Sequence, residues 1–196
     1  MAAPRRTQQE RSAATRAHLL EAAYGCLLDA GYGATTVGAV QQRAGVARGT
    51  LLHHFPTRSA LMAGVVEDII ERRLEVLTTE PDAGSELAPA GWDDVVDLIW
   101  REVRSPAFAA ALELWVAART DPDLREALLP LQTRIFLTVH RRVTALVGED
   151  HPRAPMLVQF TIDLLTGSHL AGILTPRAGT SAVVDAWKLA LRELAG

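Results

Sequence analysis

The chain has 196 residues, enough for one large domain or two small ones, and 48 % of them are hydrophobic. The single cysteine, Cys26, excludes an internal disulfide, and we see no leader-like stretch and no apolar run near the roughly 20 residues of a membrane span. The first 60 residues hold seven arginines against three acidic residues, whereas the rest of the chain is acidic and the net charge is −3. We therefore expect a cytoplasmic protein whose N-terminal part alone meets a polyanion.

The N-terminal part of the chain contains closely spaced helical patterns separated by residues that cap or break helices. Glycine or proline follows each of the first three patterns, at Gly31, Gly45 and Pro56. Thr36 and Thr57 can cap the second and fourth. The expected helices cover residues 12–30, 37–44, 47–54 and 58 onward.

The remainder of the chain also has helical periodicity throughout. Residues 79–91 are rich in proline, glycine and acidic residues, and we expect a loop there. Ser105 and Asp121 each precede a proline, a pattern typical of a helix start, while Pro130 should kink or split its helix. No strand pattern is present, so the expected fold class is all-α. The expected helices are 92–104, 106–119, 122–147, 154–174 and 182 to the C-terminal end.

The two short helices on either side of Gly45 have the pattern of a helix-turn-helix. Gly45 tolerates the positive φ that the turn requires. Leu51 and Phe55 lie on one line of the second helix, which should face the core. The other side of that helix should touch DNA. It carries Arg48, Gly49, Thr50, Leu52 and His53.

The adjacent pair His53 and His54 raises two alternatives, a metal site and a catalytic histidine. Neighbouring residues on a helix point about 100° apart, whereas histidines that share a metal usually stand four residues apart. The chain contains no H-E-x-x-H, no G-x-S-x-G and no glycine-rich phosphate loop. We expect no catalytic residue, no metal site and no cofactor.

The run T-T-V-G-A-V-Q-Q-R-A-G-V-A-R-G-T-L-L-H-H-F-P-T-R-S-A-L, residues 35–61, resembles the DNA-binding segment of the tetracycline-repressor (TetR) family. The resemblance covers residues 12–61, and beyond them only the length and the helical pattern match. It implies a three-helix DNA-binding domain over residues 10–57. It also implies a helical domain for effector binding and dimerisation over residues 58–196.

The resemblance implies a set of contacts with a double-stranded DNA operator. Arg48 and Thr50 would reach phosphates or base edges, because arginine can bind guanine with two hydrogen bonds. Arg58 would bind a phosphate, although packing is an alternative for it, as it is for Thr36 and His54. Leu52 stands where the family usually has a tyrosine. The implied DNA-binding residues are Thr36, Arg48, Gly49, Thr50, Leu52, His53, His54 and Arg58.

The C-terminal helices are the expected interface of a homodimer, since helix-turn-helix proteins usually present two recognition helices to DNA. The alternative is an internal core without a dimer. Two helices from each subunit would form a four-helix bundle, as the resemblance also implies. The expected interface residues are Leu157, Phe160, Leu164, Gly167, Val184, Trp187 and Leu191.

The middle helices carry the large side chains, for which core packing is the simpler explanation. The resemblance implies a pocket among them for a small apolar or aromatic effector. Its expected lining is Trp100, Phe108, Trp115, Phe136 and His140, with Glu113, Arg119 and Thr138 as further polar groups. We thus expect a repressor released by a ligand. The alternatives are an activator without a ligand, and an interaction or enzymatic bundle with a vestigial helix-turn-helix.

Overall fold

The structure is a computed structural model that describes residues 7–79, 91–147, 152–174 and 180–195, and every regular element in these ranges is an α-helix. The expected all-α class is confirmed. The chain divides into two compact units. Unit 1 comprises Met1–Glu80 and Ala109–Gln132, and unit 2 comprises Pro81–Phe108 and Thr133–Gly196. The functional boundary expected after residue 57 stays a prediction.

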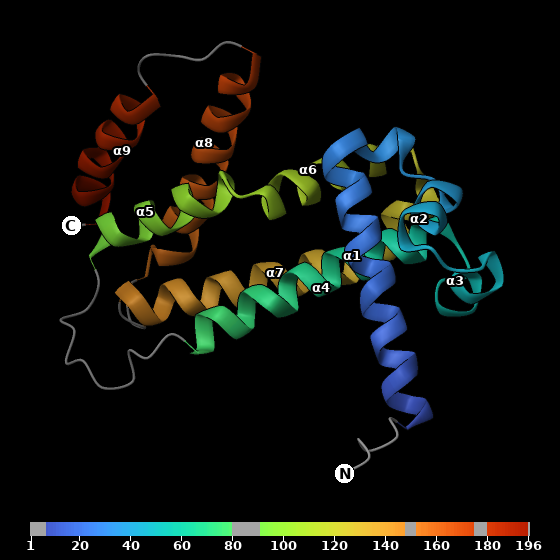
Figure 1. The fold of residues 1–196 in the computed structure, drawn as a ribbon. Helices are drawn as coiled ribbons and strands as arrows, with labels where there is room; N and C mark the ends of the chain where they lie inside the picture. Colours follow the sequence, from blue (N-terminus) through green and yellow to red (C-terminus); the bar gives the residue numbers. More distant parts are fainter. Residues whose placement is uncertain (1–6, 80–90, 148–151, 175–179, 196) are drawn as a thin grey trace. The chain divides into compact units, whose positions relative to one another are not determined.

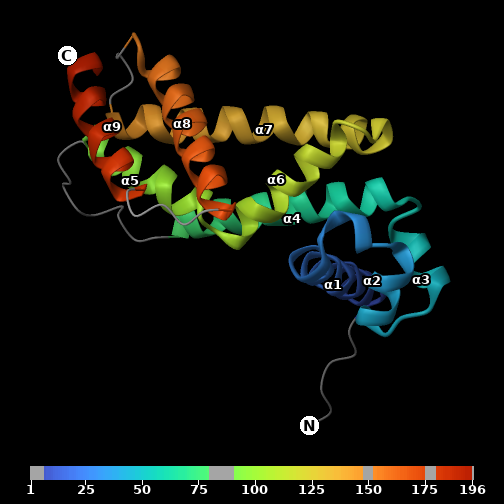
Figure 2. The same ribbon diagram turned by 90° about the horizontal axis from the view of Figure 1, so that it is seen from above.

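Unit 1 is built around the long helix α1 (Gln8–Ala34). This helix contacts α2 (Val37–Ala44) and α4 (Arg58–Thr79), and the short helix α3 (Arg48–His54) packs on α2. Figures 1 and 2 both show α3 on the side of α2 away from α1. Unit 1 also includes most of α6 (Pro106–Ala118) and the first part of α7 (Pro122–Val147).

Side-chain caps begin several of these helices where the sequence predicts them. The hydroxyls of Thr36 and Thr57 accept hydrogen bonds from the N–H groups three residues later, at 3.1 and 3.0 Å. Ser105 and Asp121 do the same at the starts of α6 and α7, at 3.1 and 3.0 Å. Ala47 makes no side-chain cap for α3. The missing cap costs about 1 kcal/mol relative to serine or threonine.

Helix α1 begins earlier than the sequence predicts, and α7 is not interrupted at its internal proline. α1 begins at Gln8, and not at residue 12, because Thr7 and Glu10 form a reciprocal capping box. The regular helix breaks at Gly31 as expected, because this glycine has a non-helical φ of 75° and ψ of 172°, and helical residues then continue to Ala34. Pro130 lies inside α7 without splitting it.

The core of unit 1 draws on every helix of the unit. α1 contributes most, since its buried side chains meet α2 on one side and α4 on the other. The side chains that are essentially inaccessible include Leu19, Leu20, Leu27, Val40, Leu51, Leu61, Met62, Leu114 and Leu124.

Gly64 of α4 packs too closely against this core to accept a larger residue. A Cβ atom at Gly64 would lie 2.8 Å from Cε1 of Phe55 and 3.0 Å from Cδ2 of Leu20. Gly64→Ala is therefore expected to lower the free energy of unfolding by about 1–3 kcal/mol, although alanine favours helix. Chemical denaturation followed by circular dichroism measures this. The control is Gly38→Ala, whose Cβ would make only an ordinary contact at 3.8 Å. Equal stability of the two variants would contradict this packing.

Unit 2 contains α5 (Trp92–Val103), α8 (Ala154–Leu174) and α9 (Thr180–Ala195), each in contact with the other two. Two ion pairs join α9 to α5: Lys188 Nζ lies 2.6 Å from Asp97, and Arg192 binds both carboxylate oxygens of Asp93. The buried core consists of Val95, Val96, Ile99, Val103, Leu157, Val158, Leu165, Val184 and Leu191.

Three residues expected at the dimer interface belong to this core instead. Leu157, Val184 and Leu191 are exposed by only 1 %, 5 % and 0 %. They pack within unit 2, where α5 contacts both α8 and α9. Phe160 and Leu164, by contrast, are exposed by 48 % and 37 %. Leu157, Val184 and Leu191 therefore fit the alternative of an internal core. Phe160 and Leu164 remain candidates for a dimer interface.

One helix does reach the length and apolarity of a membrane span, contrary to our expectation. Residues Ala154–Ile173 of α8 have a mean hydropathy of 1.2. The sequence did not indicate an apolar segment of this length, because threonine, serine and glycine interrupt the run of apolar residues without adding charge. A core helix of a globular protein meets the same criterion, and α8 packs against α5 and α9.

Candidate DNA-binding site

The turn between α2 and α3 is closed by backbone hydrogen bonds around Gly45. This glycine adopts the left-handed conformation, with φ 63° and ψ 29°. Its N–H donates to the carbonyl of Gln42 at 3.3 Å, and the N–H of Val46 donates to the carbonyl of Gln41 at 3.4 Å. A residue with a Cβ atom would be strained at Gly45. The chain therefore turns sharply into α3, as a helix-turn-helix requires.

The recognition helix α3 has one buried side and one solvent side. Leu51 and Phe55 are exposed by only 0 % and 4 %. Arg48, Gly49 and His53 are exposed, and Thr50 and Leu52 are half-buried. The side chains expected to meet DNA therefore face away from the core, and the leucine and phenylalanine anchor the helix.

The two histidines at the end of α3 differ in their surroundings. Their rings meet edge-on, with centroids 5.4 Å apart. His53 is exposed, whereas His54 is half-buried and its ring lies near that of Phe55, with centroids 6.5 Å apart. His53 is thus the more accessible of the two, and packing accounts for part of the position of His54.

Thr36 and Gly49 are both available to a phosphate backbone. Thr36 is exposed, and because its oxygen accepts the N–H of Ala39, its hydroxyl proton remains free to donate. A Cβ atom at Gly49 would meet no other atom within 4 Å, so the backbone there is open to close approach. Both placements suit contacts with DNA.

Arg58 is engaged inside unit 1. Its Nε donates to the carbonyl of Thr35 at 2.8 Å, and its Nη2 donates to the carbonyl of Tyr32. The guanidinium lies over the ring of Tyr32, 3.7 Å from the centroid. These contacts favour the packing alternative for Arg58, and a phosphate contact stays a prediction.

Tyr32 is a residue that the sequence did not single out. Its hydroxyl donates to Asp121 at 2.6 Å, and its backbone N–H donates to Glu113. Glu113 was expected to line the effector pocket, and Asp121 only to cap α7. The one local signal was a tyrosine between two glycines, Gly31 and Gly33.

The residues expected to bind an effector are only partly described. Trp100 and Phe108 of unit 2 are half-buried and pack against its core. Trp115 of unit 1 is also half-buried. The side chains of Phe136 and His140, and that of Thr138, lie outside the described residues. The expected pocket therefore stays a prediction.

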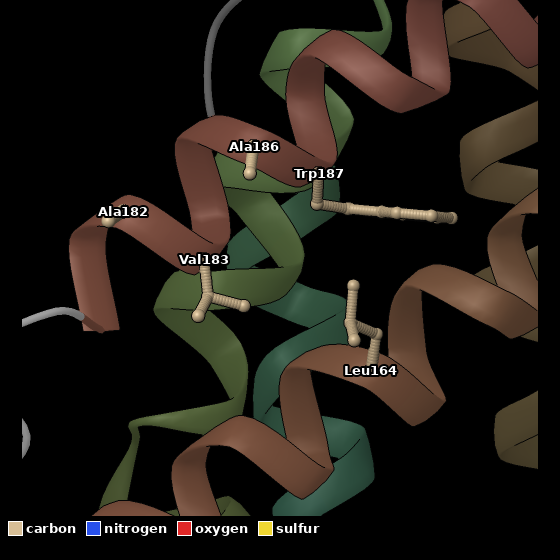
Figure 3. A pocket seen from close by; sticks show the side chains of 5 residues that line it. All are labelled: Leu164, Ala182, Val183, Ala186 and Trp187. Atoms are coloured by element: carbon tan, nitrogen blue, oxygen red, sulfur yellow. The ribbon is translucent and has the colours of Figure 1, made fainter.

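An open apolar hollow of about 390 Å³ lies between α8 and α9. Figure 3 shows Leu164 of α8 and Val183 and Trp187 of α9 around it. The indole N–H of Trp187 donates to the hydroxyl of Thr161 at 3.0 Å, which fixes one wall of the hollow. Two of the residues expected at the dimer interface, Leu164 and Trp187, thus meet here.

A left-handed glycine turn followed by a short helix with a buried apolar side and a solvent-facing basic side defines a helix-turn-helix DNA-binding protein. The family model described as "Bacterial regulatory proteins, tetR family" matches residues 19–65. An uncharacterized HTH-type transcriptional regulator of Mycobacterium tuberculosis strain H37Rv is 31 % identical over 179 residues, 88 % of this chain and 89 % of the relative. The chain belongs to the TetR family of bacterial transcriptional regulators.

Further relatives and solved structures agree with this assignment. The HTH-type transcriptional regulator CymR of Pseudomonas putida is 36 % identical over 135 residues, 65 % of this chain and 63 % of CymR. A transcriptional regulator from Rhodococcus sp. RHA1 matches with a TM-score of 0.69, covering 91 % of this chain and 94 % of that one, at 20 % identity. The multidrug binding protein EbrR, complexed with imidazole, matches with a TM-score of 0.67 over 98 % and 97 % of the two chains, at 20 % identity. At this identity the structures establish a shared fold.

Proposed function

We propose that this regulator is a repressor that binds an operator as a homodimer and is released by a small apolar or aromatic molecule. The observation that carries the DNA-binding part is the solvent-facing side of α3 above buried Leu51 and Phe55. The relatives are transcriptional regulators, which supports a role in transcription and not in catalysis. We expect the protein to act in the cytoplasm, where its DNA lies.

The exposed side of α3 suits reading of the major groove. Arg48 would bind O6 and N7 of a guanine, and His53 would reach a base edge or the backbone one turn later. Leu52 would contact a thymine methyl group or a sugar, because it lacks the hydroxyl that a phosphate contact needs. Thr36 would donate its hydroxyl proton to a phosphate at the start of α2.

Binding to DNA from upstream of the protein's own gene tests this function. Fluorescence anisotropy of that labelled DNA should give a dissociation constant of roughly 10⁻⁸ to 10⁻¹¹ M at physiological salt. A protein that neutralises about 6–10 phosphates should lose roughly 10³- to 10⁵-fold in affinity between about 50 and 200 mM salt. Equal binding to unrelated DNA, or an affinity that salt does not change, would remove the proposal.

A homodimer is supported by the exposed apolar surface of α8 and α9. Two recognition helices must lie about 34–36 Å apart, or a multiple of that, to meet successive major grooves, which a monomer cannot provide. Gly167 is exposed, and a Cβ there would meet no atom, so a second helix could approach closely. The exposed apolar side chains include Met156, Phe160, Leu164, Leu170, Ile173, Val183, Leu189 and Leu194.

Charges introduced on this surface should separate the subunits. The double variant Phe160→Arg with Leu164→Arg should be a monomer, because a dimer would bury two unpaired charges in each subunit. Light scattering after gel filtration measures its mass, and operator binding should weaken with it. Val116→Arg is the control, since Val116 is an apolar residue of α6 exposed by 60 %. A dimeric double variant would place the interface elsewhere.

The effector is proposed to be apolar or aromatic. Trp100, Phe108 and Trp115 are half-buried aromatic side chains, the type that lines small-molecule pockets. EbrR is a multidrug binding protein with solved complexes of imidazole and of ethidium, and its fold is similar. Such a molecule would release DNA only if it bound more tightly to a state of the protein with low DNA affinity.

A further inference from the structure

We propose that Tyr32, Glu113 and Asp121 form a latch that couples the α6–α7 turn to the recognition helix, with Glu113 as a positioning residue. The inference rests on the proposed function, since it concerns how the DNA-reading end of the protein is controlled. All parts of the latch lie within unit 1. The hydrogen bonds join residues 81 and 89 positions apart in the chain.

The first part of the latch is the bend of α1 at Gly31. With φ 75° and ψ 172°, this glycine leaves the helical conformation, and the N–H of Tyr32 donates to Oε1 of Glu113 on α6. A Cβ atom at Gly31 would lie 2.6 Å from that same oxygen. Glycine adopts the required φ without strain, and a side chain at this position would displace the carboxylate from the N–H of Tyr32. The bend and the carboxylate fit each other.

The second part is the hydroxyl of Tyr32. It donates to Oδ2 of Asp121 at 2.6 Å, while Oδ1 of Asp121 accepts the N–H of Leu124 and caps α7. The hydrogen bond from Tyr32, followed by that from Leu124, lowers the pKa of Asp121. Burial, followed by the bond to Asp121, raises the pKa of Tyr32 to about 12. The phenol is therefore a donor and the carboxylate an acceptor throughout the physiological pH range.

The third part of the latch is Arg58, which links Tyr32 to the end of α3. The ring of Tyr32 lies under the guanidinium of Arg58, whose donors hold the carbonyls of Tyr32 and Thr35. Arg58 is the first residue of α4, and α3 ends at His54 only four positions earlier. A shift of Tyr32 is thus passed through Arg58 to the end of the recognition helix.

The chain's connectivity gives this latch a position suited to control. α6 begins in the segment assigned to unit 2 and enters unit 1 at Ala109, and α7 leaves unit 1 after Gln132. Each of these two helices, which have residues in both units, brings one acidic residue to Tyr32. Glu113, Asp121 and Tyr32 are half-buried, and their contacts are polar. Such bonds change stability little in net terms when they exchange with water, which suits a contact that opens and closes.

Hydrogen exchange with and without DNA tests the latch, because coupling between two sites is reciprocal. The probe is duplex DNA from upstream of the protein's own gene. In the wild type, saturating DNA should slow amide exchange in residues 109–124 by roughly fivefold or more, the lower end of typical coupling. Tyr32→Phe and Glu113→Ala should lose this protection, and because the coupling is reciprocal their DNA affinity should fall by up to the same factor.

Matched variants separate positioning from general stability. Glu113→Gln keeps an acceptor for the N–H of Tyr32 and should retain most of the DNA-induced protection. Glu126→Ala removes an exposed acid of α7 and should behave as wild type. If Tyr32→Phe and Glu113→Ala show the same DNA-induced protection as wild type, these contacts are structural only and do not couple the two regions.

The remaining outcomes distinguish the latch from the proposed function. If the wild type binds the DNA but exchange in residues 109–124 does not change, the latch is wrong and the DNA-binding function stands. If the wild type binds no DNA, the proposed function falls and the latch with it. Tyr32→Phe keeps the ring over Arg58 and the bond to Glu113, so a folded variant remains for the comparison even if Glu113→Ala unfolds.

Discussion

Replacing Leu51 with alanine should lower the free energy of unfolding by about 2–5 kcal/mol. Leu51 is exposed by 0 % and is the buried anchor of α3, a helix of only 7 residues without a side-chain cap. The substitution removes buried apolar surface and leaves a cavity that so short a helix cannot fill. The change should appear as an earlier denaturation midpoint, followed by circular dichroism, and DNA binding should weaken because α3 is no longer held in place.

The adjacent residue provides the control. Leu52 is half-buried and points about 100° away from Leu51 on the helix. Leu52→Ala should change the free energy of unfolding far less than Leu51→Ala, by roughly 1 kcal/mol or below. It should instead weaken binding to operators that carry a thymine at the contacted position. Equal loss of stability in the two variants would mean that the core and DNA sides of α3 are assigned wrongly.

Replacing Arg48 with alanine should cost roughly 1–3 kcal/mol in operator binding, a loss of about 5- to 150-fold in affinity. Arg48 is exposed at the start of α3, where recognition helices contact base edges. Its loss should also relax the preference for one base pair, because a guanine would no longer be distinguished. Anisotropy titrations with the operator and with single-base variants of it measure both effects.

Arg43→Ala is the matched control for Arg48→Ala. Arg43 is an exposed arginine of α2, but its guanidinium is held by Asp29 of α1 at 2.6 Å. The variant should leave base preference unchanged. If Arg48→Ala bound all single-base variants with the wild-type preference, Arg48 would contact phosphate only.

Features that depend on neighbouring residues could be predicted from the sequence. Thr36, Thr57, Ser105 and Asp121 cap helices as expected, since a cap requires only an acceptor three residues before an N–H group. Gly45 adopts the positive φ that its position in the motif requires. The family and the fold class follow from these local patterns.

Features that depend on distant partners could not be predicted. Leu157, Val184 and Leu191 form an apolar stripe that a second chain or another helix of the same chain could cover, and α5 belongs to the core that contains them. The position of Arg58 at the start of a helix predicts a phosphate contact. In the structure, however, its guanidinium donates hydrogen bonds to the carbonyls of Tyr32 and Thr35. No local pattern states which of two possible partners a side chain meets.

The central claim is that the exposed side of α3 enters a major groove, and methylation interference at guanine N7 tests it most directly, because that atom lies in the major groove. Methylation of a guanine in each half-site of the operator should abolish binding of the wild type. With Arg48→Ala, methylation at the guanine that Arg48 reads should no longer change the affinity. Wild-type binding that is indifferent to N7 methylation throughout the protected DNA would contradict the claim.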